Sequence, residues 1–246
     1  MGKLHRMVEL ISVPGALHGV LTWKKFSLAA YLILVRLKEA GVKPATVLDV
    51  GANVGQFSVA VSHLFPDAAL YPVEPDPATA QRLCSNLPAR VAANVTVSAV
   101  GERVGMVEFQ VNADSQVSSI LPLGNGRKQA FPESNVQRTM TVPLTTLDAL
   151  FGGKALPHPI LLKIDVQGYE DRVIAGATEL LQHVRWVVLE MSFARLYDGE
   201  KDFPWMLNMM SQRGFKFVRP LDFHTSDKTG AIIEMDGLFE NIALVN

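Results

Sequence analysis

The stretch from Thr46 to Phe57 constrains the fold more than any other part of this chain. It reads TVLDVGANVGQF: an apolar run with Asp49 near its end, a glycine-containing turn, and the start of an amphipathic pattern. This order predicts a buried strand, a tight turn and a helix. Gly51 and Gly55 let the backbone bend sharply and approach a ligand closely, because no Cβ stands in the way. A ligand at this turn would meet the unpaired N–H groups of the helix start together with the carboxylate of Asp49.

Short apolar segments alternate with helical patterns after this turn. Further strands are expected at 68–73, 94–101, 159–165 and 184–191, and a helix follows from Pro77, a residue suited to a first helical turn. Strands and helices follow one another over short connections, which is typical of a parallel, doubly wound sheet. The sequence therefore predicts an α/β fold.

Two segments depart from the parallel pattern. Residues 104–111 and 139–144 resemble strands, and the first alternates between apolar and polar side chains, as a strand with one wet face does. We expect these two to form an inserted β-hairpin, joined by a long loop over 114–133. The segments 215–218 and 239–245 are expected to close the sheet.

The length of the chain suits one well-buried domain. It has 246 residues, of which 48% are hydrophobic, and α/β domains often reach this size without splitting. We expect residues 44–246 to form this domain and residues 1–43 to form an N-terminal helical extension that stops near Gly41. The extension is expected to pack on the domain, with a lid over a substrate cleft or a dimer contact as functional alternatives. Both a monomer and a homodimer are compatible with the sequence.

Composition and charge narrow the classes of partner. The net charge of −1, with no basic block, argues against a nucleic acid partner. Cys84 is the only cysteine, so no internal disulfide forms; with no convincing signal peptide, a cytoplasmic location is expected. The apolar run 28–35 is too short for a transmembrane helix, which needs about 20 apolar residues. Residues 17–26 are apolar enough for peripheral contact with a membrane.

Carboxylates stand at four of the five expected strand ends. These are Asp49, Glu74, Asp165 and Glu190, while the third strand ends at Ala99 and Val100. Ligands of open parallel sheets bind outside the carboxyl ends of the strands. Four carboxylates aimed at one crevice repel one another unless a ligand needs them. We therefore expect a cationic or hydroxyl-rich ligand.

The acid at the second strand end indicates a cofactor that contains adenosine. Glu74 is placed to accept hydrogen bonds from both hydroxyls of a ribose. Asn53 and Gln56 stand where a dinucleotide fingerprint needs glycines, and Asp49 would repel a pyrophosphate. S-adenosylmethionine carries a positive sulfonium and ammonium and no phosphate, so it suits the turn better than a nicotinamide dinucleotide does; a turn that binds nothing is the structural alternative. The residues expected to hold the cofactor are Asp49, Gly51, Ala52, Asn53, Gly55, Glu74, Ala99, Val100 and Asp165.

Several motifs together resemble the FkbM family of adenosylmethionine-dependent methyltransferases. They are DVGANVG at 49–55, VEP at 73–75, Ser118–Ser119, VPL at 142–144, LKIDVQGYE at 162–170 and LE at 189–190. The resemblance covers about residues 46 to 220, and the KIDVQGYE block is its most specific part. It implies a Rossmann-like class I methyltransferase fold, with a mostly parallel seven-stranded sheet whose last strand is antiparallel. It also implies O-methylation of a hydroxyl on a sugar or a polyketide.

The catalytic candidates surround this block. Asp165 is the first candidate for the general base, with binding of the cofactor's ammonium and capping of the next helix as alternatives. Lys163 faces the same side as Asp165 and forms either a plain ion pair with a nearby acid or a contact that tunes the base. Glu170 is placed to cap a helix start or to take part in catalysis. Glu190 ends its strand where it could contact the substrate.

Loop residues complete the candidate site. Ser118, Ser119 and His224 are expected to contact the substrate. The two serines could instead bind the cofactor carboxylate or belong to a plain solvated loop, and His224 could also act as a base. The six histidines show no metal-binding spacing, so no metal is expected, although Asp165 and Glu190 could form a Mg²⁺ site. We predict an adenosylmethionine-dependent O-methyltransferase that acts on a sugar hydroxyl of a bacterial glycan or glycolipid. The alternatives are a polyketide or other natural product as acceptor and a catalytically silent module that binds adenosylmethionine.

Overall fold

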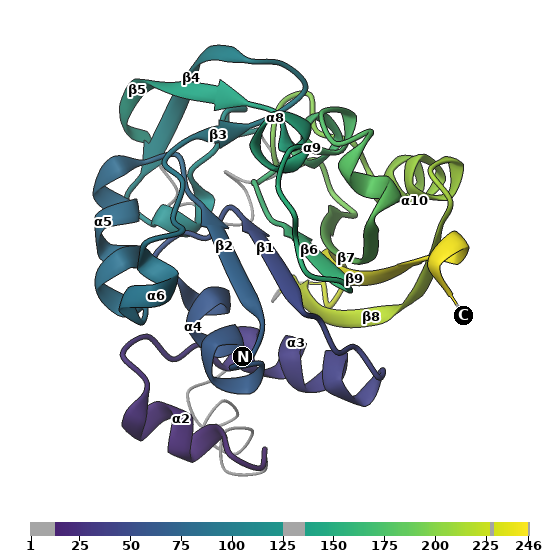
Figure 1. Cartoon of the computed structure of the whole chain (residues 1–246). Coiled ribbons are helices and arrows are strands. Elements are labelled where there is room, and N and C mark those ends of the chain that lie inside the picture. The colour runs from purple at the N-terminus through teal and green to yellow at the C-terminus, as the bar shows by residue number, and fades with distance from the viewer. Residues whose placement is uncertain (1–12, 125–135, 227–228, 246) are drawn as a thin grey trace.

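Two β-sheets form the framework of the protein. The computed structural model describes residues 13–124, 136–226 and 229–245. The main sheet has the strand order β2-β1-β6-β7-β9-β8, and a smaller sheet has the order β3-β5-β4 (Figure 1). The strands of the main sheet are β1 (Thr46–Val50), β2 (Ala69–Val73), β6 (Ile160–Ile164), β7 (Val184–Ser192), β8 (Phe215–Thr225) and β9 (Ile232–Asn241). Those of the smaller sheet are β3 (Ala99–Val100), β4 (Gly105–Asn112) and β5 (Val136–Thr145).

The strand directions confirm the predicted class of fold. β2, β1, β6 and β7 run parallel, whereas β9 runs antiparallel to both β7 and β8. The antiparallel pairing of β4 with β5 confirms the inserted hairpin. The result is a mostly parallel sheet with antiparallel end strands.

The expected strand at 94–101 differs from the prediction. Only Thr96 reaches the main sheet, through an isolated bridge to Val73. Ala99 and Val100 pair instead with Leu144 and Thr145 of β5, because the inserted hairpin offers them a free strand edge. Within the described part of the chain, the main sheet therefore has six strands instead of seven.

The closing strands are longer than predicted. Residues 215–218 were expected to form one of them, but β8 continues to Thr225. The other was expected at 239–245, but β9 begins at Ile232 and a short 3₁₀-helix covers Ile242–Leu244. Polar side chains in both strands face the cleft described below, and this hides the apolar alternation by which a strand is recognised in sequence.

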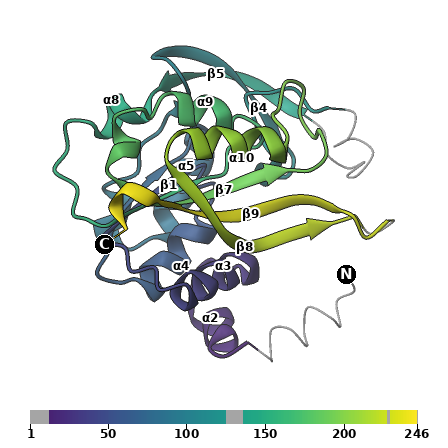
Figure 2. The same cartoon turned by 90° about the vertical axis from the view of Figure 1, so that its right-hand side faces the viewer.

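Helices cover both faces of the main sheet. Figure 2 shows α3 (Leu28–Glu39) and α4 (Gln56–Leu64) on one face and α9 (Glu170–Ala175) and α10 (Phe203–Gln212) on the other. Val47 packs in the first layer and its neighbour Leu48 in the second, since successive side chains of a strand point to opposite faces. The remaining helices are α2 (Ala16–Thr22), α5 (Pro77–Asn86), α6 (Ala89–Ala92) and α8 (Leu147–Phe151).

Helix α3 packs against the main sheet although it precedes the first strand. The Ser27 hydroxyl caps its start by accepting a hydrogen bond from the N–H of Ala30. Its buried side chains Ile33, Leu34 and Leu37 join the same apolar cluster as α4. The start of α3 therefore lies beside the carboxyl ends of the strands. Within the described ranges, no helix is both long and apolar enough to cross a membrane.

Candidate active site

One cleft of about 450 Å³ lies at the carboxyl ends of β1, β2, β6 and β7. The loops after β1 and β2 and residues 114–118 line one end of it. The start of α3 and the inner face of the β8–β9 hairpin line the other. The cleft thus joins the glycine turn that follows β1 to a second region rich in carboxylates.

The turn after β1 fits tightly against the end of β6. Gly51 has a φ of 82°, and a Cβ there would lie 1.8 Å from the carbonyl oxygen of Asp165. Glycine is therefore required at this position. Asn53 also has a positive φ, of 50°, and its side-chain Oδ1 accepts a hydrogen bond of 2.8 Å from the Ser115 hydroxyl. Gly55, with a φ of 96°, precedes the first residue of α4.

Glu74 connects the end of β2 to this turn. Its Oε2 accepts a hydrogen bond of 2.9 Å from the N–H of Asn53, and its Oε1 accepts one of 3.0 Å from the N–H of Asp76. Burial raises the pKa of Glu74 to about 7 even though these N–H groups favour the charged form. Ala52, Ala99 and Val100 line the same end of the cleft. The residues expected to hold a cofactor therefore line this one cleft, with the exception of Gly55, which does not line it.

Asp49 is more deeply buried than we expected for a residue at the end of a strand. Its side chain is fully buried, and its Oδ2 accepts a hydrogen bond of 2.5 Å from the Ser58 hydroxyl of α4. Its Oδ1 has no hydrogen-bond partner among the described residues. Burial raises the pKa of Asp49, and the positive charge of Lys163 opposes that rise. An unpaired buried acceptor beside the cleft is a place for a donor from a ligand.

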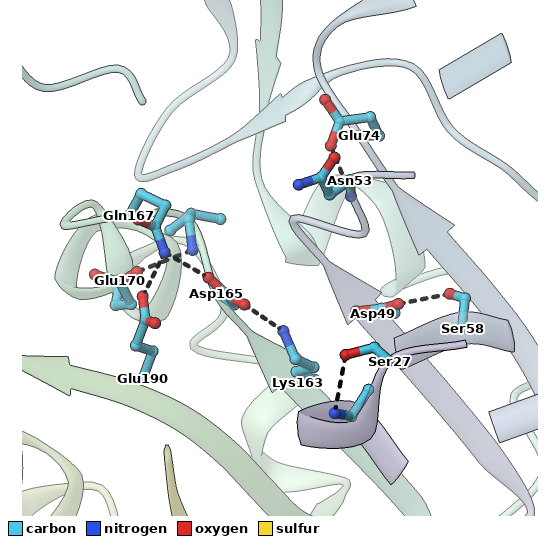
Figure 3. A network of polar contacts seen from close by, with 12 residues as sticks. Ser27, Asp49, Asn53, Ser58, Glu74, Lys163, Asp165, Gln167, Glu170 and Glu190 are labelled. Atoms are coloured by element: carbon cyan, nitrogen blue, oxygen red, sulfur yellow. Dashed lines mark hydrogen bonds and ion pairs between the residues drawn. The ribbon is translucent and has the colours of Figure 1, made fainter. Parts of the chain in front are cut away.

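The specific block of the sequence forms a continuous polar network (Figure 3). Lys163 Nζ lies 2.8 Å from Asp165 Oδ2, so the predicted ion pair is with Asp165. Gln167 Nε2 donates to Asp165 Oδ1 at 2.9 Å and to Glu190 Oε2 at 2.7 Å. The other end of this amide, Oε1, accepts a hydrogen bond of 2.7 Å from the Tyr197 hydroxyl. Both oxygens of Asp165 are therefore engaged.

The charges of this network differ sharply from residue to residue. Burial alone would lower the pKa of Lys163, but the negative charges of Asp165, Asp49 and Asp236 outweigh it and hold the pKa above its usual range. Burial raises the pKa of Asp165, yet Lys163 and Gln167 outweigh it and the pKa is lowered. Burial and the neighbouring carboxylates raise the pKa of Glu190 well above its usual range. The environment therefore favours the charged form of Asp165 and the neutral form of Glu190.

Comparison with known proteins identifies the family of this chain. The sequence model of the methyltransferase FkbM domain matches residues 49–217 of this chain. The chain belongs to the FkbM family of methyltransferases. This confirms the resemblance that the motifs indicated and the prediction of a methyltransferase.

Two relatives of this FkbM-family protein are methyltransferases by name. The chain is 29% identical over 191 residues to the 2-O-methyltransferase NoeI of Sinorhizobium fredii, covering 75% of this chain and 77% of that one. It is 27% identical over 155 residues to the hexuronic acid methyltransferase AglP of Haloferax volcanii, covering 63% of this chain and 59% of that one. The crystal structure of a methyltransferase FkbM from Methylobacillus flagellatus has a similar fold, with a TM-score of 0.50 and 16% identity. That similarity covers 80% of this chain and 44% of the other, so this chain spans less than half of that protein.

Two of the residues expected to act in this FkbM-family site have structural roles instead. Glu170 is buried at the start of α9 and accepts hydrogen bonds from the N–H groups of Val166 at 2.9 Å and Gly168 at 3.3 Å. Burial raises its pKa to about 8, and it does not line the cleft. Glu170 therefore holds the turn after β6 at the start of α9, which agrees with the capping alternative for this residue.

The two serines of the loop differ in the same way. Ser119 is buried; its hydroxyl donates a hydrogen bond of 2.6 Å to the carbonyl of Gln167 and accepts one of 3.0 Å from the N–H of Leu121. It supports Gln167 and does not line the cleft, so the structure gives Ser119 a structural contact and no direct access to a ligand there. Ser118 lines the cleft, and its hydroxyl accepts a hydrogen bond of 3.0 Å from the N–H of Asn112.

The β8–β9 hairpin contributes residues that the sequence did not indicate. Asp222, Glu234 and Asp236 line the cleft together with the predicted His224. Nδ1 of His224 lies 3.7 Å from Glu234 Oε2, and the interaction with this carboxylate raises the pKa of His224. One feature of the sequence could have revealed them: acids stand at the alternate positions 234 and 236, which places both side chains on the same face of a strand.

The Mg²⁺ site considered at Asp165 and Glu190 has no complete ligand set here. Lys163 and Gln167 contact these carboxylates. Over the part of the chain that the structure describes, no group of three or more His, Cys, Asp or Glu side chains is arranged to hold a metal ion.

Proposed function

We propose that this protein is an S-adenosylmethionine-dependent O-methyltransferase whose acceptor is a sugar hydroxyl of a glycan or glycolipid. The observation that carries the proposal is the single cleft that joins the Gly51 turn and Glu74 to the network around Asp165. A methyl donor at the first end would present its methyl group to an acceptor at the second. Its cytoplasmic location belongs to the same proposal and rests on the lone Cys84.

The first end of the cleft fits the proposed cofactor in chemistry. Glu74 keeps lone pairs on both carboxylate oxygens for a ribose diol, since each oxygen accepts one backbone N–H. The carboxylate of Asp49 and the turn at Gly51 favour a positively charged, phosphate-free ligand over a dinucleotide. Bound here, the cofactor would supply an electrophilic methyl group, whose bond to sulfur breaks with the electron pair left on sulfur.

The residues around Asp165 would orient the acceptor and hold charges in place. Lys163 and Gln167 fix Asp165 from two sides, so its carboxylate has one defined direction toward the cleft. Positioning of an acceptor oxygen in line with a methyl group can account for a large part of the rate of such a transfer.

The relatives favour a sugar over a polyketide as acceptor. AglP is by name a methyltransferase of a hexuronic acid, and NoeI is by name a 2-O-methyltransferase. A hydroxyl-rich acceptor is also compatible with the carboxylates of the cleft, because a carboxylate accepts hydrogen bonds from hydroxyl donors.

A labelled methyl group tests this function directly. The protein is incubated with S-adenosylmethionine that carries a labelled methyl group and with a panel of glycans, glycolipids and hydroxylated polyketides. Label on a sugar oxygen is the expected result, and label only on polyketides would favour the other acceptor class. Calorimetric binding of S-adenosylhomocysteine without transfer to any acceptor would favour the silent binding module.

A further inference from the structure

Three carboxylates face one another across the strands at the acceptor end of the cleft. Glu190 on β7 is directly opposite Asp236 on β9, and Asp236 is directly opposite Asp222 on β8. All three line the cleft. Opposed residues of antiparallel strands have Cβ atoms about 4.5–5.5 Å apart, and like charges placed so are destabilising. Each carboxylate therefore needs a compensating partner or a proton.

Two of these carboxylates are compensated within the protein. Glu190 accepts a hydrogen bond of 2.7 Å from the side-chain amide of Gln167, and burial raises its pKa, which favours the neutral form. Asp222 pairs with Arg36 of α3, whose Nη1 lies 3.1 Å from its Oδ1. Among the residues that the structure describes, no hydrogen bond or ion pair reaches the carboxylate of Asp236. Asp236 is thus the member of the row left for a ligand.

We propose that the acceptor sugar binds over this row and that Asp236 receives the proton of its reacting hydroxyl. The inference rests on the proposed function and adds the general base to it. As the acceptor oxygen forms its bond to the methyl carbon, its proton moves to a carboxylate oxygen of Asp236. The proton passes to water when the methylated product leaves, so the residue returns to its starting form.

The electrostatics of the site agree with this assignment. Burial raises the pKa of Asp236 to about 7, with Lys163 opposing the rise and Asp165 and Asp222 adding to it. A general base works best with a pKa near the working pH. Asp165, the base favoured by its position in the sequence, has a lowered pKa and both oxygens engaged, so it is the weaker base. The ionisable groups around Asp236 are Lys163, Asp165, Glu190, Asp222, His224 and Glu234, with Arg36 beyond Asp222.

The test compares Asp236→Asn with two other variants on one acceptor that the unaltered enzyme methylates. Rates are measured from pH 5.5 to 9 at saturating S-adenosylmethionine, so that titration of Glu74 does not affect them. The control is Glu240→Gln, which removes a carboxylate from the same strand outside the cleft. Asp165→Asn tests the rival base. S-adenosylhomocysteine binding is measured by calorimetry for each variant.

We expect kcat/KM of the unaltered enzyme to fall as the pH drops below about 7, because Asp236 becomes protonated. This decrease at low pH is the acid limb of the pH profile. Asp236→Asn should lower kcat by about 10²–10⁴-fold and abolish the acid limb. It should leave the affinity for S-adenosylhomocysteine within about twofold of that of the unaltered enzyme. Glu240→Gln should keep both the rate and the limb. If Asp236→Asn keeps the acid limb with kcat within fivefold of the unaltered enzyme, the assignment is wrong. It is also wrong if Asp165→Asn, and not Asp236→Asn, removes the limb; absence of turnover in the unaltered enzyme would instead count against the proposed function.

Discussion

Replacement of Lys163 tests how the cleft holds its carboxylates. Lys163 is 5% exposed, its Nζ lies 2.8 Å from Asp165 Oδ2, and Asp49 is its direct neighbour on β1. Lys163→Met keeps the length and most of the apolar contacts of the side chain, including its packing near the Phe57 ring. It removes the buried cation and leaves the buried carboxylate of Asp49 and the partly exposed carboxylate of Asp165 without their shared positive partner.

The expected loss in the free energy of unfolding is about 3–5 kcal/mol at pH 8, since breaking a buried ion pair leaves an uncompensated charge. The loss should shrink at pH 5, because the carboxylates freed of Lys163 take up protons and their repulsion fades. Lys163 itself adds no pH dependence in this range. Its folded-state pKa is raised, so its stabilising effect is complete below its ordinary pKa of about 10.4 and is lost only at higher pH.

Urea unfolding followed by tryptophan fluorescence at pH 8 and pH 5 measures both effects. The double variant Lys163→Met with Asp165→Asn should recover most of the stability, because it removes the carboxylate charge of Asp165 together with the lysine that neutralised it. Lys154→Met, a lysine that contacts Tyr71 and Phe151 outside the cleft, serves as control and should cost less than about 1 kcal/mol. A loss below about 1 kcal/mol at pH 8, or an equal loss at both pH values, would refute the reasoning.

Three further predictions concern the two ends of the cleft. Glu74→Gln should weaken S-adenosylhomocysteine binding by tenfold or more, and the rise in affinity expected from pH 6 to 8 as Glu74 ionises should disappear; calorimetry at three pH values measures both. Gly51→Ala should abolish that binding, because its Cβ would meet the Asp165 carbonyl at 1.8 Å, and a melting curve should show a loss of at least about 1 kcal/mol. Neutral glycosides should be methylated at least tenfold faster than matched hexuronides, because a second carboxylate would be repelled near Asp236 and Glu234; equal rates at low salt would contradict this.

The arrangement around Gly51 and Glu74 could be predicted from the sequence because it is local. The strand, the glycine turn and the acid at the end of β2 follow one another closely along the chain, and their chemistry follows from that order. Strand alternation explains why Asp49 is buried against Ser58, which the prediction of an accessible strand-end acid missed.

The end of the cleft around Asp165 and Asp236 depends on contacts that sequence patterns do not encode. Asp236 meets Glu190 only through the pairing of β9 with β7. Gln167 has a positive φ of 58°, and its side-chain amide forms hydrogen bonds with three side chains. Neither feature can be read from the spacing of residues in the sequence. Glu170 carries a carboxylate, as a catalytic acid does, and only its burial beneath the turn shows that it supports the local backbone.

The position of α3 and of the β8–β9 hairpin has a consequence for how acceptor choice can change. The FkbM match covers residues 49–217, whereas Ser27 and Ile33 on one side of the cleft, and Asp222 and Asp236 on the other, lie before and after that segment. Two walls of the cleft thus lie outside the segment that matches the family model. To change the acceptor of such a protein, we would therefore exchange both walls together between family members and keep the central segment.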